Sequence, residues 1–403
     1  MLTYLSRGAT WLLAALLTLA AGTSFYFSLN HPITADLAML HYSAWLINEK
    51  HFVLYRDIFD INFPAPYLFH SLLGKLLGYE APPLRWVDFS LMAALGWASW
   101  KILSPLSKPA ALFGFSLFCL LYWINGGEFA LERDVLALVL AVIAFAFACD
   151  NEHSLSKIIS IGTFAAIACS MKPNTVVIVP VLLWMLYSQA VSNHRKLTAI
   201  SLFLITIIFV LLTPFVWISL NGGLDSFSDI YRHYMPIYAN SRYDLYHYEN
   251  STERWTTLFA QYLQYGGVSL LLAAPGLIWV WILNPKNTLA HKRILQLAVV
   301  NFAFTFYEVI AGKFWLNHMF PSAYWSFICC SLLLTTPNNN AKIWKKILAI
   351  IFIIPCVFLS LFIADKTLSS MTLAHNNEKL EPMFWRARQV AVYLKSQHLQ
   401  PDD

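Results

Sequence analysis

Residues 197–220, LTAISLFLITIIFVLLTPFVWISL, form the stretch that decides the fold. The stretch contains no charged residue, and a helix of about 20 residues is long enough to cross the roughly 30 Å hydrocarbon core of a bilayer. The whole chain shares this character, because hydrophobic residues make up 58% of its 403 residues and charged residues only 12%, about half the usual charged share. A soluble fold is therefore excluded, and we expect an all-α polytopic membrane protein whose backbone groups are paired within helices.

Apolar runs recur along the chain and predict about eleven transmembrane helices. They cover residues 11–29, 84–103, 110–124, 134–149, 158–170, 175–188, 197–220, 266–283, 294–311, 315–335 and 347–364. The first run is expected to be an uncleaved signal anchor, because it is longer than the apolar core of a usual signal peptide. Residues 66–78 are too short to cross and carry His70 and Lys75, so they predict a helix that lies at the membrane interface.

The positions of the lysines and arginines predict how the chain is oriented. With the N-terminus in the cytoplasm, most basic residues fall in cytoplasmic loops, as the positive-inside rule requires. The short outer loops then keep only Arg133, Lys172 and Lys313. The cytoplasmic set consists of Lys101, Lys108, Lys157, Arg195, Lys196, Lys286, Lys292, Arg293, Lys342, Lys345 and Lys346.

Two outer segments are too long to be simple connections. They are residues 30–66 in the first outer loop and residues 221–265 in the fourth, and both are rich in tyrosine, histidine and charged residues. This composition is typical of helices that lie in the headgroup layer. We expect one membrane domain over residues 1–364, with these two loops on its outer face, followed by a short extracytoplasmic tail over residues 365–403.

The net charge and the cysteines argue against several other classes of function. A net charge of +5 is small for this length, and the basic residues lie in short loops, so nucleic-acid binding has little support. The six cysteines lie within or at the ends of apolar runs and form no CxxC motif. We therefore expect buried cysteine side chains rather than disulfides or metal ligands.

Most ionisable residues that the positive-inside rule does not explain collect at the outer membrane face. Charge held near hydrocarbon is expensive, so such a collection is a functional-site hypothesis by default. Carboxylates in it can accept a proton, and its cations and histidines can hold a phosphate. The set consists of Asp36, His41, Arg56, Asp57, Asp60, His70, Glu128, Glu132, Arg133, Asp134, Lys172, Glu308, Lys313 and His318.

Several motifs follow one another along the outer face. Asp36 lies soon after the first span, and the later motifs are YRDIFDINFPAP at 55–66, GEFALERD at 127–134, MKPN at 171–174 and GKFWLNHMFP at 312–321. In order and spacing, this set resembles the GT-C class of polyprenyl-phosphate-sugar-dependent glycosyltransferases. The protein O-mannosyltransferases and the aminoarabinose transferase acting on lipid A belong to that class. Two departures indicate a divergent member: Asp36 has no acidic neighbour, and Asn62 and Phe63 replace the basic residue that commonly precedes the loop proline.

The resemblance implies a membrane glycosyltransferase that moves a sugar from a polyprenyl-phosphate carrier to an extracytoplasmic lipid, glycan or protein acceptor. It implies inversion, with Asp36 as the general base, and a bacterial inner (plasma) membrane location with the active site outside. No cofactor is required, although a divalent metal held by Asp36, Asp57 and Asp60 is an open alternative. The expected phosphate ligands are Arg133, Lys172, Lys313 and His318, and the expected substrate-binding residues are Tyr55, Asp57, Asp60, Asn62, Glu132 and Tyr238.

Structural roles compete with each of these assignments. Asp36 can cap a helix over residues 37–47, and Asp57 and Asp60 can pair with Arg56 or with the loop backbone. Glu132 and Arg133 can form a local salt bridge that lets a span begin. Lys172 can be a headgroup anchor, and His318 an interfacial histidine.

Two other classes of function remain open. A transporter or flippase for a lipid-linked precursor would place charged or interrupted helices at the bilayer midplane. Pro180, Pro275 and Pro355 do interrupt spans, but most charges lie at one face. A structural subunit of an envelope-glycan assembly complex would have no need for Asp36.

Overall fold

The computed structural model describes residues 2–29, 35–123, 129–150, 154–189, 193–240, 251–262, 268–311 and 316–375. Within these ranges the chain is helical, and its one β contact is an isolated bridge between Leu54 and Ile58. The elements are α1 (Leu2–Ser28), α2 (Ala35–Glu49), α3 (Pro64–Leu77), α4 (Ala81–Leu103), α5 (Lys108–Tyr122), α6 (Arg133–Ala148), α7 (Leu155–Met171), η1 (Pro173–Val177), α8 (Ile178–Gln189), α9 (Asn193–Leu220), α10 (Leu224–Asn240), α11 (Ser251–Tyr262), α12 (Val268–Leu283), α13 (Thr288–Phe304), α14 (Tyr307–Ala311), α15 (Leu316–Ser331), η3 (Leu332–Leu334), α16 (Ile343–Ile351) and α17 (Ile353–His375).

The helices follow the predicted apolar segments. Three of them are long and apolar enough to cross a membrane, covering Leu2–Ser28, His194–Leu220 and Ile343–Thr367, and several shorter apolar helices accompany them. These features agree with the prediction of an all-α membrane protein, whereas the count of eleven crossings stays a prediction. Helix α17 continues past residue 364 to His375, so the first part of the expected tail is helical.

The predicted span 347–364 is divided between α16 and α17, which meet at Phe352. Pro355 explains the division. Proline has no backbone N–H, so the carbonyl of Ile351, four residues earlier, loses its helical hydrogen-bond partner. Helix α16 ends at that residue.

Helix α6 forms the centre of the bundle, where it packs against α4, α7 and α15. Every residue after Asp134 in this helix is apolar, and a helix that is apolar on all sides is buried on all sides. Small residues let other helices approach closely. A Cβ added to Gly276 of α12 would lie 2.1 Å from the carbonyl oxygen of Cys329 in α15, so only glycine fits there.

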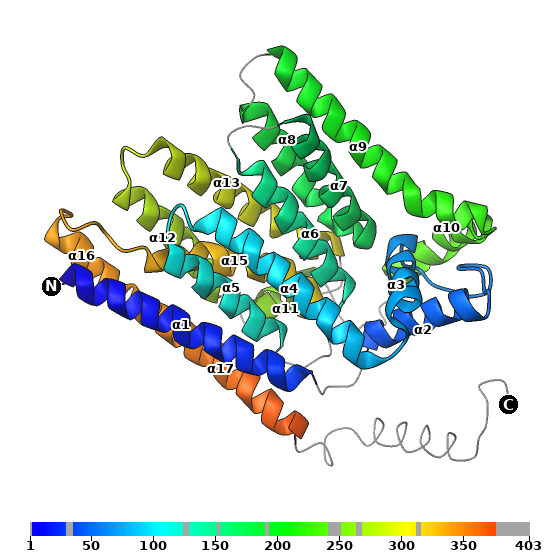
Figure 1. Cartoon of the computed structure of the whole chain (residues 1–403), viewed down its shortest axis with the longest axis horizontal. Coiled ribbons are helices and arrows are strands. Elements are labelled where there is room, and N and C mark those ends of the chain that lie inside the picture. The colour runs from blue at the N-terminus through cyan, green and yellow to red at the C-terminus, as the bar shows by residue number, and fades with distance from the viewer. Residues whose placement is uncertain are drawn as a thin grey trace.

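Helices α2, α3 and α10 lie together at one end of the molecule, and the N-terminus and α16 lie at the other (Figure 1). Residues 66–78, which we predicted as an interfacial helix, form most of α3. Two prolines in its first turn favour helix initiation, and Gly78, with φ 77°, ends it. Helix α3 packs against α2, so these two short helices cover the end of the bundle where the candidate site lies.

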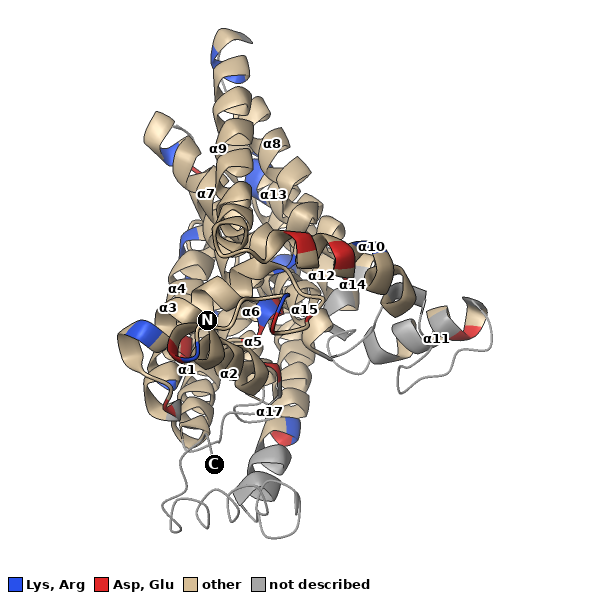
Figure 2. Ribbon diagram, turned by 90° about the vertical axis from the view of Figure 1, so that its right-hand side faces the viewer, with Lys and Arg blue, Asp and Glu red and all other residues tan. Residues whose placement is uncertain are grey.

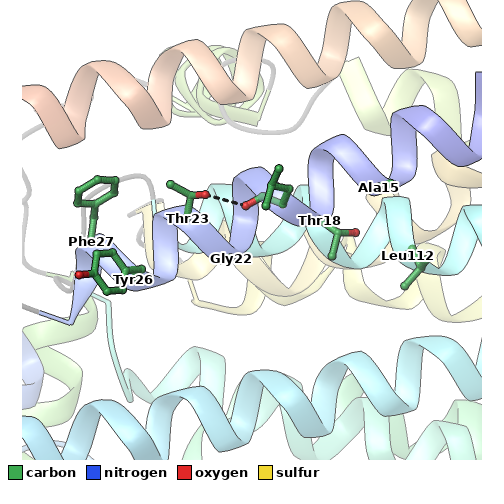
Figure 3. Close-up of a pocket in the computed structure, with 8 residues that line it drawn as sticks. Ala15, Thr18, Gly22, Thr23, Tyr26, Phe27 and Leu112 are labelled. Carbon is green, nitrogen blue, oxygen red and sulfur yellow. Dashed lines mark hydrogen bonds between the residues drawn. The ribbon is translucent and has the colours of Figure 1, made fainter.

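A groove runs along the outer face of α1 (Figure 3). The opposite face of α1 buries Ala14, Leu17 and Ala21 in the core. Thr23 donates its hydroxyl to the carbonyl oxygen of Leu19 at 2.9 Å, which leaves a mostly apolar lining. The lining residues are Ala15, Thr18, Leu19, Gly22, Thr23, Tyr26 and Phe27 of α1 and Leu112 of α5.

Candidate functional site

Arg133 joins two of the predicted motifs at the end of the bundle. It is the first residue of α6, and its side chain is 11% exposed. Its Nη2 donates to Oδ2 of Asp36 at 2.5 Å, and its Nη1 donates to Oδ1 of Asn62. Because Asp36 lies in the first turn of α2, which begins at Ala35, it is not the residue that caps that helix. The guanidinium instead links α2, the loop before α3 and α6.

The loop before α3 holds Asn62 in a fixed orientation. Oδ1 of Asp60 accepts hydrogen bonds from the backbone N–H of Asn62 at 2.8 Å and from its Nδ2 at 2.7 Å. The side-chain oxygen of Asn62 therefore faces Arg133. The hydroxyl of Tyr55 donates to the carbonyl oxygen of Asn62 at 2.5 Å, and burial raises the pKa of Tyr55, so this hydroxyl stays a donor.

A second group of side chains surrounds Asp134, the residue after Arg133. Its carboxylate is fully buried and lies 2.9 Å from Nζ of Lys172. The hydroxyl of Tyr307 donates to its other oxygen at 2.5 Å. Nζ of Lys172 also lies 3.3 Å from Nε2 of His318. Lys172 follows the C-terminus of α7 and His318 lies in the first turn of α15, so four helices meet here.

Glu132 connects the two groups. Its Oε1 lies 3.9 Å from Nη2 of Arg133 and accepts a hydrogen bond from Nδ2 of Asn317 at 2.9 Å. Burial, with the neighbouring charge of Asp134 as the next cause, raises the pKa of Glu132 to about 7. Its Oε2 accepts a hydrogen bond from the backbone N–H of Asp134 at 3.3 Å. The residues thus form a continuous charged network, which consists of Asp36, Asn62, Glu132, Arg133, Asp134, Lys172, Tyr307, Asn317 and His318.

The structure brings together most of the residues expected from the sequence, but it pairs the cations among them with carboxylates. Arg133 and Lys172 were expected to face the donor phosphate as cations, whereas each already contacts a carboxylate. Asp57 lies elsewhere, paired with Arg56 at 2.9 Å on an exposed turn. Tyr238 lies near the end of α10 and, like Asp57, is not among the described partners of Arg133 or Lys172. Lys313 lies outside the described residues.

In the described ranges, no three acidic, histidine or cysteine side chains are grouped so as to hold a metal ion. The six cysteines are free and buried, as expected. Tyr307 and Asn317 are members of the network that the sequence reasoning missed. Tyr307 lies in an apolar stretch, and a buried tyrosine hydroxyl usually needs a hydrogen-bond partner. The sequence does not say which residue that partner is.

No protein-family model and no curated protein sequence matches the chain. One solved structure with a similar fold is the apo form of the oligosaccharyltransferase from Archaeoglobus fulgidus. The two chains are 10% identical, the TM-score is 0.49, and the similarity covers 88% of this chain and 56% of that chain. This chain therefore spans little more than half of that protein's length. At this level of similarity the function has to be argued from the residues of the network themselves.

Proposed function

We propose that this protein is a membrane glycosyltransferase that moves a sugar from a polyprenyl-phosphate carrier to an extracytoplasmic acceptor with inversion. The observation that carries the proposal is the contact between Asp36 and Arg133 at 2.5 Å, next to the buried group of Asp134, Lys172 and His318. A base and several cations at one end of an apolar bundle are what transfer from a lipid phosphate requires.

Asp36 is the proposed general base. Its Oδ2 is held by Arg133, and its Oδ1 accepts no hydrogen bond from the described residues. The side chain is 30% exposed, so Oδ1 can accept the proton of an acceptor hydroxyl. As that proton leaves, the hydroxyl oxygen bonds to the anomeric carbon from the face opposite the phosphate, and the bond from carbon to phosphate oxygen breaks. The transition state has oxocarbenium character, and a positioned base contributes roughly 10²- to 10⁴-fold.

The cations of the network stabilise the departing phosphate, which takes the electron pair of the broken bond. Nε of Arg133 is buried and has no partner among the described residues, so the guanidinium keeps a donor for the phosphate. Lys172 and His318 supply further donors, and Asp134 holds Lys172 in place. Fixed donors of this kind stabilise developing charge without reorganising. Lys313 would add a further cation.

The remaining proposed roles are in binding the sugars and the prenyl chain. Asn62 and Glu132 contact Arg133, and Tyr55 and Asp60 hold Asn62. These four residues are proposed to position the sugars. The prenyl chain is proposed to lie in the groove of α1, whose lining ends at Tyr26 and Phe27. We place the protein in the inner membrane of a bacterial cell, with this site facing outward.

A transfer assay tests the proposal. The full-length protein in liposomes is supplied with radiolabelled polyprenyl-phosphate sugars and cell-envelope acceptors, and the anomeric configuration of the product is determined by NMR. We expect an inverted product and a loss of roughly 10²- to 10⁴-fold in rate for Asp36→Asn, with Asp150→Asn as the matched control. Equal rates at equal folded yield would remove Asp36 from the mechanism. Flux of substrate without a new glycosidic bond would favour a transporter.

A further inference from the structure

The turn that leads into α6 contains an unusual backbone conformation at Leu131. Its φ is 53°, in the left-handed region that residues with a side chain rarely adopt. The backbone N–H of Glu132 donates to the carbonyl oxygen of Phe129 at 3.1 Å, so Leu131 is the third residue of a tight turn, where a positive φ favours glycine. A conformation of this kind persists only where the surrounding structure holds it, and such residues cluster at functional sites.

The side chain of Leu131 explains why the residue is not glycine. It is buried in a small apolar cluster that also contains Leu37 and Met171. These two residues are the chain neighbours of Asp36 and Lys172, so the cluster ties the turn to two segments of the charged network. Glycine would adopt the backbone conformation freely but would lose this packing. Keeping leucine here therefore requires another group that holds the backbone.

Asp88 of α4 is placed to be that group. It is buried and accepts a hydrogen bond from the hydroxyl of Tyr122, and the backbone N–H of Leu131 faces both its carboxylate and that hydroxyl. The cation beside it is Arg85, one turn earlier in α4 and also buried. A pair at this spacing on a helix surface would only stabilise the helix, but a buried pair carries a desolvation cost that apolar residues would avoid. Its place against the turn explains why it is kept.

The turn sets the direction of three successive side chains. Glu132, Arg133 and Asp134 follow it directly, and their contacts lie on α15, on α2 and just beyond the end of α7. Blue and red bands lie close together beside the label of α6 in Figure 2. A rotation of the backbone at Leu131 would displace all three side chains. A displacement of about 1 Å at a reacting group can cost roughly 10²-fold in rate.

We propose that Asp88 and Leu131 are positioning residues for the transfer reaction. Asp88 holds Leu131 in its left-handed conformation, and the turn in this form aims Arg133 at Asp36. Both positioning residues act through Arg133 rather than on the substrate. The inference rests on the proposed function, because Arg133 and Asp36 are the cation and the base assigned there.

The first test replaces the buried polar cluster as a whole. Arg85→Met/Asp88→Leu/Tyr122→Phe, the apolar triple variant, keeps the volume of the cluster, so the full-length protein should still fold. We expect its transfer rate in liposomes to fall roughly ten- to hundredfold. Tyr122→Phe alone should lower the rate roughly two- to tenfold, as expected for the loss of one hydrogen bond. The matched control is Ser99→Ala/Tyr324→Phe, which removes a buried hydroxyl pair 2.8 Å apart and should transfer like wild type.

Substitutions at Leu131 separate positioning from a purely structural role. Leu131→Gly and Leu131→Ala both remove the packing, but only glycine adopts the left-handed conformation freely. With Asp88 present, the two variants should transfer at similar rates, because the carboxylate holds the turn. In the apolar triple variant, Leu131→Gly should transfer about five- to thirtyfold faster than Leu131→Ala, the factor that corresponds to the backbone preference. A cluster that only stabilised the fold would give no such difference in rate.

Equal rates for glycine and alanine in the apolar triple variant would overturn the proposal, and so would wild-type transfer by that variant at equal folded yield. Hydrogen exchange of the backbone amides of residues 131–134, followed by mass spectrometry in nanodiscs, reports on the turn without any transfer. Exchange should become faster in the apolar triple variant but not in the control. If exchange responds in this way and wild type transfers no sugar, the proposed function alone fails. If wild type transfers sugar and exchange does not respond, the positioning inference alone fails.

Discussion

The two ends of helix α6 each carry a cluster of ion pairs, and the clusters differ in burial. At the C-terminal end, Oδ2 of Asp150 lies 3.0 Å from Nζ of Lys101 and 2.7 Å from Nζ of Lys157. These side chains are 26–31% exposed. At the N-terminal end, Asp134 is 0% exposed and its partner Lys172 is 13% exposed. Solvent-screened pairs of the first kind contribute little to stability, whereas pairs of the second kind carry a large desolvation cost.

This difference in burial indicates which end of α6 holds the candidate functional site. The cluster around Asp150 has the position and exposure expected of charges that fix orientation in a membrane. The network around Arg133 and Asp134 keeps charge where water is scarce, which apolar packing would avoid at lower cost. The buried end is therefore the one where a role in chemistry explains the residues.

The largest expected effect is a loss of stability when one lysine is removed, and it differs between the two ends of α6. Lys172→Ala leaves the buried carboxylate of Asp134 without its ion-pair partner, and we expect the free energy of unfolding to fall by about 3–5 kcal/mol. Lys157→Ala at the other end should lower it by about 1 kcal/mol or less. Unfolding by SDS in mixed micelles measures both values. The double variant Lys172→Met/Asp134→Leu should recover most of the loss, and similar losses for the two single variants would contradict the contrast.

The next effect concerns the pH dependence at the buried end. The pKa of Glu132 is raised to about 7, so its stabilising contribution is full below about pH 4.5 and is lost as the pH rises through 7. We expect wild type to lose on the order of 3 kcal/mol across this range relative to Glu132→Gln. The free energy of unfolding of both proteins between pH 4.5 and 7.5 measures it. Parallel curves would show that folding does not raise the pKa of Glu132, which would contradict this prediction.

His70 should produce a smaller effect of opposite sign. It is fully buried in α3, its ring contacts His41 edge to face, and burial lowers its pKa to about 3. Its contribution is therefore present above about pH 6.5 and is lost as the pH falls toward 3. Between pH 7 and 5, wild type should lose roughly 2 kcal/mol relative to His70→Leu. The same unfolding measurements check this, and a difference that does not change with pH would contradict it.

The smallest effect tests the exposed end. Asp150→Asn removes the acceptor shared by Lys101 and Lys157, and we expect a loss below about 1 kcal/mol that shrinks as salt is added. Unfolding in 0.1 M and 1 M NaCl, compared with wild type, measures this loss. A loss above about 3 kcal/mol, unaffected by salt, would mean that this cluster is as strongly coupled as the buried one.

Hydropathy was enough to predict the apolar helices, and the short length of residues 66–78, with His70 and Lys75, was enough to predict α3. The meeting of Asp36 with Arg133 followed from the order of motifs in the resemblance. The pairing of Tyr307 with Asp134 could not be predicted, because residues 173 positions apart meet only through the rotation of α6 and α14. For the same reason, the sequence did not reveal that each cation would already contact a carboxylate.

The affinity for a fluorescent polyprenyl phosphate tests most directly the claim that the buried network holds a lipid phosphate. It is measured in nanodiscs for wild type, for Lys172→Gln/Asp134→Asn, which removes the buried pair together, and for Lys157→Gln/Asp150→Asn, which does the same at the other end. We predict that the first double variant weakens binding about tenfold or more, the equivalent of roughly 1.4 kcal/mol, while the second binds like wild type. Equal affinity in all three proteins would contradict the account.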